Sequence, residues 1–135
     1  MQLQPYLSFE GRCEEAIAFY RQTVGAELTM MLRWKDSPDQ SMCGAGNADK
    51  IMHAELRIGD TALMASDGRC QGQPNFQGFC LSLTAANEAE ADRAFAALSD
   101  GGQVQMPLAQ TFFSPRFGMV ADRFGVTWMV YVPQA

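Results

Sequence analysis

RFGMVADRFGVTW, residues 116–128, has two runs of strand-forming residues on either side of a turn that contains a glycine. An upstream stretch, HAELRIGDTALMASD, residues 53–67, has the same layout. Aligning Gly59 with Gly125 also pairs Arg57 with Arg123, Ile58 with Phe124 and Leu63 with Met129. The chain therefore contains two related hairpins, and this duplication decides the fold class.

Each hairpin is preceded in the chain by a strand, a helix and a further strand. In the first half, residues 3–9, 12–24 and 29–34 are predicted to form these elements. In the second half, the corresponding elements are residues 78–84, a helix that begins at Asn87, and residues 104–108. Gly25 and Gly101 are placed to end the two helices. The predicted order is βαβββ, stated twice.

Length and composition favour one α+β domain made of two modules. The 135 residues are 47% hydrophobic, which is enough for a core without disulfides or a structural metal. The first module is expected at residues 1–67 and the second at 78–135, with a linker at 68–77. A module of about 65 residues is near the lower limit for an independent core, so the two are expected to bury surface together.

Charge and hydropathy exclude two classes of partner. The net charge is −5, from 10 basic and 15 acidic residues, and the basic residues are scattered, which argues against a nucleic-acid partner. No segment approaches the roughly 20 apolar residues that span a bilayer, and the N-terminus lacks the features of a secretory signal. We therefore expect a cytoplasmic protein with no membrane partner.

The cysteines are expected to be reduced thiols. The four cysteines are Cys13, Cys43, Cys70 and Cys80, and they form no C-x-x-C pair. The chain has a single histidine, so a Cys/His zinc site is not favoured, and cytosol keeps thiols reduced. Structural disulfides are the alternative. The segment CGAGNADK, residues 43–50, has only two of the glycines of a nucleotide-binding fingerprint, so no cofactor is predicted.

The duplicated βαβββ order resembles the vicinal oxygen chelate superfamily, which includes glyoxalase I, extradiol dioxygenases and bleomycin-resistance proteins. The chain is most similar to the PhnB-like branch, over residues 5–28, 53–67 and 110–132. The resemblance implies paired modules whose curved sheets form a cup for a small-molecule ligand, and it implies a homodimer. It leaves open whether modules pair within a chain or across a dimer.

The resemblance also locates the superfamily's metal ligands. In metal-dependent relatives, four side chains from four strands hold one divalent ion, and the matching positions here, to within a residue, are Pro5, Leu63, Phe79 and Met129. None is a His, Asp or Glu, the residues that such a cation prefers. No metal is therefore expected at that position.

Strand alternation predicts which residues face the cup. Alternate residues of the first hairpin form an apolar set for the helix side: Ala54, Leu56, Ile58, Ala62 and Met64. The second hairpin offers Val120, Val126, Trp128 and Val130. The opposite faces would then line the cup with His53, Glu55, Leu63, Ala65, Phe117, Met119, Ala121, Met129 and Tyr131.

His53 and Glu55 are the candidate catalytic residues. They lie two apart on one strand, so their side chains are on one face, with bases about 7 Å apart. His53 is predicted to act as a general base or hydrogen-bond donor, with Glu55 tuning it or binding a cation. Two solvated polar residues on a wet sheet face are the alternative interpretation.

The remaining candidates would bind the ligand rather than react with it. Arg33 precedes a long loop and could hold a carboxylate or phosphonate. Arg116 lies among aromatic residues, where its stem could instead cover Phe113 or Phe117. The predicted apolar wall comprises Leu63, Phe79, Phe113, Phe117, Met119 and Met129.

The function predicted from the sequence is binding of a small, largely apolar or aromatic molecule in a metal-free cup, with His53-assisted proton transfer. One alternative is a sequestering protein that binds without chemistry. Another is a metal-dependent enzyme whose ion has moved to His53 and Glu55. The loop at residues 35–50 is long enough to act as a lid, and the sequence does not name the ligand.

Overall fold

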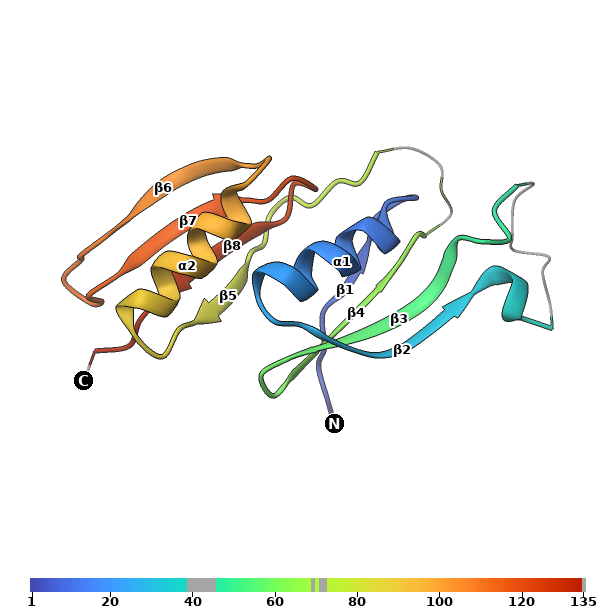
Figure 1. Cartoon of the computed structure of the whole chain (residues 1–135), viewed down its shortest axis with the longest axis horizontal. Coiled ribbons are helices and arrows are strands. Elements are labelled where there is room, and N and C mark those ends of the chain that lie inside the picture. The colour runs from blue at the N-terminus through green and yellow to red at the C-terminus, as the bar shows by residue number, and fades with distance from the viewer. Residues whose placement is uncertain (39–45, 69, 71–72, 135) are drawn as a thin grey trace. The chain divides into compact units, whose positions relative to one another are not determined.

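The computed structural model describes residues 1–38, 46–68, 70 and 73–134. The chain divides into two compact units, Met1–Pro74 and Asn75–Ala135, and the division falls inside the segment expected to be a linker. Within these residues, each unit has one α-helix and one four-stranded sheet (Figure 1).

The first unit has the predicted order, with a short 3-10 helix added after the second strand. Its elements are β1 (Tyr6–Ser8), α1 (Cys13–Thr23), β2 (Glu27–Arg33), η1 (Trp34–Asp36), β3 (Ile51–Ile58) and β4 (Thr61–Ser66). The strand order in the sheet is β1-β4-β3-β2, with β1 parallel to β4 and the other neighbours antiparallel. Gly25 follows α1 with φ +67°, a conformation that glycine adopts without a steric cost.

The second unit repeats this arrangement. Its elements are β5 (Leu81–Thr84), α2 (Glu88–Ser99), β6 (Gln103–Ala109), β7 (Phe117–Ala121) and β8 (Thr127–Tyr131), and the strand order is β5-β8-β7-β6. Asn87 caps α2, because its side chain accepts a hydrogen bond from the Glu90 N–H at 2.8 Å. Pro107 is tolerated because β6 lies at the sheet edge. The α+β class and the doubled βαβββ order are confirmed.

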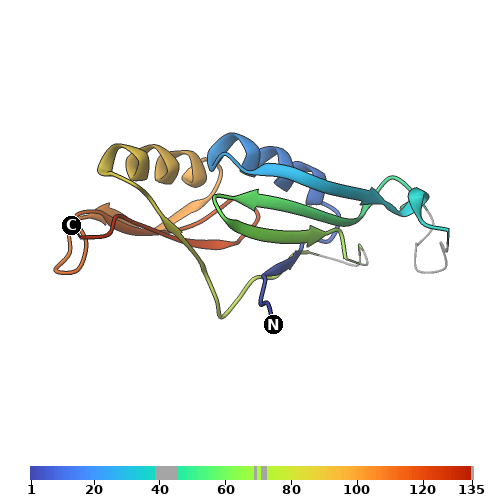
Figure 2. The ribbon, with the colours of Figure 1, turned by 90° about the horizontal axis from the view of Figure 1, so that it is seen from below.

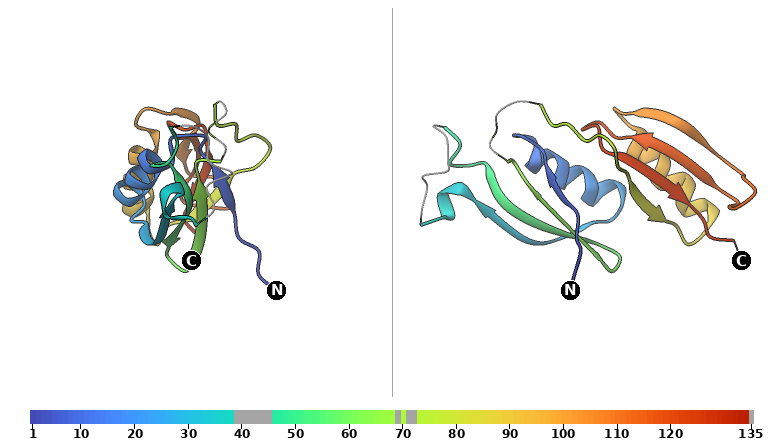
Figure 3. Two further views of the ribbon diagram at one scale, coloured as in Figure 1. Left: turned by 90° about the vertical axis from the view of Figure 1, so that its right-hand side faces the viewer. Right: turned by 180° about the vertical axis from the view of Figure 1, so that it is seen from behind.

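One helix covers one face of each sheet (Figure 2). In the second unit, α2 buries the stripe predicted from its spacing, Ala91, Ala94, Phe95 and Leu98. Gly118 on β7 permits this close packing, since a Cβ there would lie 2.8 Å from the Phe95 ring. In the first unit, α1 buries Cys13, Ala16, Ile17, Phe19 and Tyr20. We call the side of each sheet that its helix leaves uncovered the open face. The right-hand view of Figure 3 shows the second sheet with its strands in front of α2.

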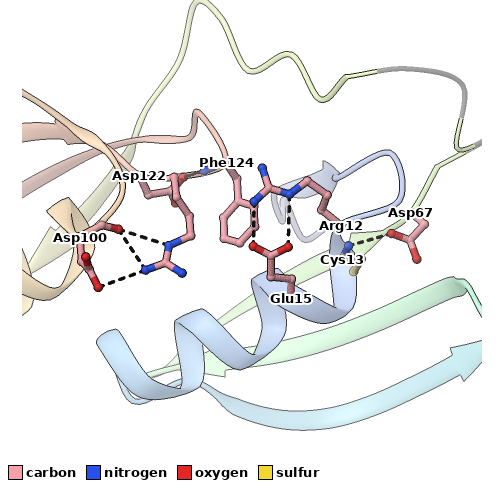
Figure 4. Close-up of polar contacts among 8 residues, drawn as sticks. Arg12, Cys13, Glu15, Asp67, Asp100, Asp122 and Phe124 are labelled. Atoms are coloured by element: carbon pink, nitrogen blue, oxygen red, sulfur yellow. Dashed lines mark hydrogen bonds and ion pairs between the residues drawn. The ribbon is translucent and has the colours of Figure 1, made fainter.

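The carboxylate of Asp67 joins three elements of the first unit. Asp67 follows β4 and is 1% exposed. One oxygen accepts the Cys13 N–H at the start of α1 at 2.7 Å (Figure 4). The other oxygen accepts the Ile51 N–H at the start of β3, also at 2.7 Å. Burial, followed by the nearby Asp67 carboxylate, raises the pKa of the Cys13 thiol far above its usual range. Cys13 is therefore an inert core thiol.

The register of the first hairpin corrects part of the sequence analysis. β3 and β4 pair Ala54 with Ala65 and Leu56 with Leu63, so all four face α1, and each is 2% exposed or less. The assignment of Leu63 and Ala65 to the open face is therefore wrong. The turn between Ile58 and Thr61 contains two residues, so each even-numbered residue of β3 lies opposite an odd-numbered residue of β4. Met64 and Ala62 lie on the open face instead.

The second hairpin keeps the predicted faces. Its connection, residues 122–126, places Val120 opposite Trp128 and Gly118 opposite Val130 beneath α2. The Asp122 carboxylate fixes this turn, because it accepts hydrogen bonds from the backbone of Phe124 and Val126 and from the Trp128 indole N–H. The open face then carries Phe117, Met119, Ala121, Met129 and Tyr131, as alternation predicted.

No helix among the described residues is long and apolar enough to cross a membrane.

Neighbouring substitutions on β4 test the corrected faces. Leu63→Ala should lower the free energy of unfolding by about 2–5 kcal/mol, because it leaves a cavity beneath α1. Met64→Ala should lower it by about 1 kcal/mol or less, because the side chain is only partly buried. The midpoint of urea unfolding measures both. Equal losses, or a larger loss at Met64, would restore the sequence-based assignment.

Asp67→Asn tests the three-way carboxylate junction. The amide has the same shape but presents an NH₂ group to one of two backbone donors, so we expect a loss of about 2–3 kcal/mol in the free energy of unfolding. The matched control is Asp60→Asn in the exposed β3–β4 turn, which should stay within about 0.5 kcal/mol of the parent. Similar midpoints for the two variants in chemical denaturation would contradict the role given to Asp67.

Candidate functional site

Four side chains form a row across the open face of the first sheet. Tyr6 on β1 lies opposite Met64 on β4, Met64 lies opposite Glu55 on β3, and Glu55 lies opposite Met30 on β2. Tyr6 is 49% exposed and Met30 39%. The row therefore places one carboxylate between two thioethers, with a phenol at one end.

His53 lies two residues from Glu55 on the same strand, and both its ring nitrogens have partners. Its Nδ1 is 3.0 Å from the Tyr6 hydroxyl, and its Nε2 is 3.5 Å from a Glu55 carboxylate oxygen. The Tyr6 and His53 rings are tilted by 30° with centroids 5.6 Å apart. The structure thus brings the predicted pair together and adds Tyr6, which was not predicted.

The open face of the second sheet has an analogous row without a titratable group. Ser82 on β5, Met129 on β8, Met119 on β7 and Met106 on β6 lie opposite one another in turn. Met106 is 45% exposed. Met129 therefore occupies the position in the second row that Met64 occupies in the first, whereas the sequence alignment paired Met129 with Leu63.

Aromatic rings extend the apolar surface of the second unit. Phe113 packs edge-on against Phe117, with ring centroids 5.0 Å apart, and against Phe112, with ring centroids 5.1 Å apart. Phe79 is 45% exposed and contacts Phe76 edge-on at 6.4 Å. Phe79, Phe113 and Phe117 thus lie in aromatic clusters, whereas Leu63 lies in the core of the first unit.

Arg33 lies on the helix side of the first sheet, opposite Ile51. Its guanidinium donates two hydrogen bonds to the Glu14 carboxylate, at 2.7 and 3.2 Å, and one to the Asp49 carbonyl. These hydrogen bonds lower the pKa of Glu14, so the pair contributes stability at neutral pH that is lost as the pH falls through that lowered pKa. Because Glu14 is largely exposed, the contribution is small.

Arg116 is directed toward α2. Its guanidinium lies 3.1 Å from the Asp92 carboxylate and 4.0 Å from that of Glu88, with 35% of the side chain exposed. Arg33 and Arg116, the two arginines predicted to bind the ligand, therefore already contact carboxylates of their own unit.

The two described ends of the loop predicted as a lid are joined to each other next to the first sheet. The Trp34 and Lys35 N–H groups donate to the carbonyls of Lys50 and Ala48, and Lys35 forms an ion pair with Asp49 at 3.0 Å. Residues 39–45 of that loop, including Cys43, lie outside the described residues. Cys13 and Cys80 are free thiols.

The donor set does not fit the divalent ion of the metal-dependent relatives. The four matched positions offer a proline, a leucine, a phenylalanine and a methionine. Within the described ranges, no group of three or more His, Cys, Asp or Glu side chains could hold a metal ion. His53 and Glu55 supply two ligands at most, and a structural or catalytic ion of this kind takes three or four from the protein.

Sequence reasoning missed several open-face residues, among them Tyr6, Met30, Met64, Ser82 and Met106. Tyr6 and Met30 become visible only when strands distant in sequence are paired, because β1 and β2 reach Met64 and Glu55 through register rather than local spacing. Met64 was assigned to the helix side, and the β3–β4 register places it on the open face. A single strand's alternation shows its two faces, but it does not say which face joins a neighbour's.

Residues 1–131 match the model of the family described as 3-demethylubiquinone-9 3-methyltransferase. The chain belongs to this family. Protein YjdN from Escherichia coli K12 is 37% identical over 140 residues, covering 98% of this chain and 95% of YjdN. The sequence-based resemblance to the PhnB-like branch is therefore confirmed.

Solved structures agree with the family membership. A Pseudomonas aeruginosa protein is 46% identical with a TM-score of 0.87, covering 100% of this chain and 99% of that one. A Bacillus cereus PhnB protein is 27% identical with a TM-score of 0.81, covering 98% and 99%. The fosfomycin resistance protein FosX from Listeria monocytogenes, at 10% identity, TM-score 0.67 and coverage of 99% and 93%, shows the shared glyoxalase-type fold alone.

The donor set generates a prediction about metal content. Protein purified without added metal should contain no divalent ion in stoichiometric amount, because two ligands hold such an ion weakly. Elemental analysis before and after dialysis against a chelator measures this directly. One equivalent of metal that disappears in a His53→Gln variant would instead establish an ion at His53 and Glu55.

Proposed function

We propose that this family member binds a small, largely apolar or aromatic molecule against the open face of the first sheet, where His53 assists proton transfer. The observation that carries the proposal is the contact of His53 with Tyr6 on one nitrogen and Glu55 on the other, beside Met64. A histidine held between a hydroxyl and a carboxylate has the arrangement of a general base.

The surroundings favour a neutral ligand. Glu55 is on the open face, and the neighbouring cation on β3, Arg57, pairs with Glu27. Met30 and Met64 offer flexible thioether side chains that adapt to apolar shapes. An isomerase-like reaction moves one proton between two atoms of the ligand, and a lyase-like reaction removes one proton while the ligand expels its own leaving group. Both can begin with proton abstraction by a base on such a surface.

The methyl transfer in the family's description is not part of this proposal. Nucleotide-type methyl donors are commonly bound at glycine-rich turns between a strand and a helix. The β1–α1 connection contains the single glycine Gly11, and the β5–α2 connection, Ala85 to Asn87, contains none.

Sequestration without chemistry is the second candidate function, favoured by the second sheet. Its row of Ser82, Met129, Met119 and Met106 has binding surface but no proton-transfer group. Tight binding with no turnover, unchanged in His53→Gln, would support this candidate.

We also propose a homodimer. Exposed apolar side chains such as Phe112 (93%) and Val104 (44%) support this proposal. Sedimentation equilibrium tests it, and a monomer at all concentrations would contradict it.

Deuterium exchange into a neutral carbon acid tests proton transfer. Phenylacetone has an aromatic body and a weakly acidic C–H, and its exchange in D₂O is followed by proton NMR. The protein should accelerate exchange above the buffer rate, and His53→Gln should remove about 10²–10⁴-fold of that acceleration.

Retention of the unfolding midpoint in His53→Gln is the control for an intact fold. Exchange no faster with the protein than in buffer, or equal in parent and variant, contradicts proton transfer at His53.

A further inference from the structure

The two nitrogens of His53 have different kinds of partner. The Tyr6 hydroxyl is within hydrogen-bond distance of Nδ1, and a Glu55 carboxylate oxygen lies 3.5 Å from Nε2, within the range of an ion pair. An ionised carboxylate only accepts, so the nitrogen facing Glu55, Nε2, carries the proton. In the neutral ring the other nitrogen, Nδ1, is then an acceptor, and the Tyr6 hydroxyl at 3.0 Å donates to it. The three side chains form a hydroxyl–imidazole–carboxylate series.

The sheet register holds Tyr6 in this position from a different strand. Tyr6 and Glu55 both lie opposite Met64, on β1 and β3 respectively, so the Tyr6 ring reaches across β4 to His53. The contact spans two strand spacings, and the length of the Tyr6 side chain allows its hydroxyl to come within 3.0 Å of Nδ1. The contact therefore depends on pairing within one rigid sheet and not on a loop.

Neither imidazole nitrogen is left to meet a ligand directly. Tyr6 covers Nδ1 and Glu55 faces Nε2, and 23% of the His53 side chain is exposed. Tyr6 is exposed over 49% of the residue surface, and its oxygen keeps acceptor capacity after it donates to His53. The phenol oxygen is thus the accessible end of the series.

We infer that Tyr6 is the residue that contacts the ligand, with His53 as its base and Glu55 positioning the imidazole. This deepens the proposed function and rests on it. A Ser–His–Asp triad uses the same order of groups, hydroxyl to imidazole to carboxylate, on unrelated folds. Here a phenol occupies the outer position, which suits proton abstraction.

The proton transfer balances without any co-reactant. A ligand C–H proton moves to the Tyr6 oxygen while the Tyr6 proton moves to Nδ1 of His53. The C–H electron pair stays on the ligand as an enolate, and the imidazolium that forms is stabilised by the ionised Glu55. The reverse transfer returns a proton to the ligand at the same or a neighbouring atom. The ligand class is a neutral carbon acid with an apolar body.

The single histidine makes the geometry testable without any activity. Nitrogen-15 labelled histidine gives one imidazole spin system, in which hydrogen bonding to Nδ1 changes that nitrogen's chemical shift. Tyr6→Phe should move the Nδ1 signal toward that of a free, unprotonated ring nitrogen and leave the Nε2 signal nearly in place. Tyr131→Phe, which removes a phenol hydroxyl from the open face of the second sheet, is the matched control and should move neither.

The phenylacetone exchange assay then separates the inference from the proposed function. Tyr6→Phe should lower the maximal exchange rate about 10²-fold or more with a small change in KM, approaching the loss in His53→Gln. An Nδ1 signal unaffected by Tyr6→Phe overturns the series. Full exchange in Tyr6→Phe but none in His53→Gln overturns the role of Tyr6 and leaves the proposed function standing. No acceleration by the parent protein overturns both.

Discussion

The two-residue turn between β3 and β4 is the constraint on which the candidate site depends. By pairing Ile58 with Thr61, it makes Leu63 and Ala65 share a face with Leu56 and Ala54 beneath α1. Met64 is then the residue between Glu55 and Tyr6. A turn longer or shorter by one residue would exchange the two faces of β4 and bury a different set of side chains.

The duplication that reveals the fold in the sequence also conceals this register. Aligning Gly59 with Gly125 matches the sequences of the two turns, but the turns differ in length. The connection between the paired residues Arg57 and Ala62 is one residue shorter than the connection between the paired residues Ala121 and Thr127. The helices were predictable because their apolar spacing is local, and the cap of α2, Asn87, is local too. The faces of β7 and β8 were also predictable. The face of β4 was not, because it depends on how the chain crosses one turn.

The candidate site was predictable only in part for the same reason. His53 and Glu55 are two apart on one strand, so sequence alone places them together. Tyr6 is 47 residues from His53, and only the β1–β4–β3 order brings them within hydrogen-bond distance. Arg33 shows another contribution of the topology, because this predicted anion-binding residue contacts Glu14 of α1 on the helix side. Chemistry that spans several strands requires the topology before it can be read.

The N-termini of α1 and α2 are capped in different ways, and this difference bears on when each helix is completed during folding. Asn87 caps α2 from within the same short segment, so that helix has its N-terminal hydrogen bond as soon as it forms. The start of α1 relies on Asp67, 54 residues away from Cys13, and this bond requires β3 and β4 to be in place. Closing that long loop costs chain entropy before any contact compensates for it. During folding, α2 should therefore mature early, and α1 should dock in one of the last steps of its unit.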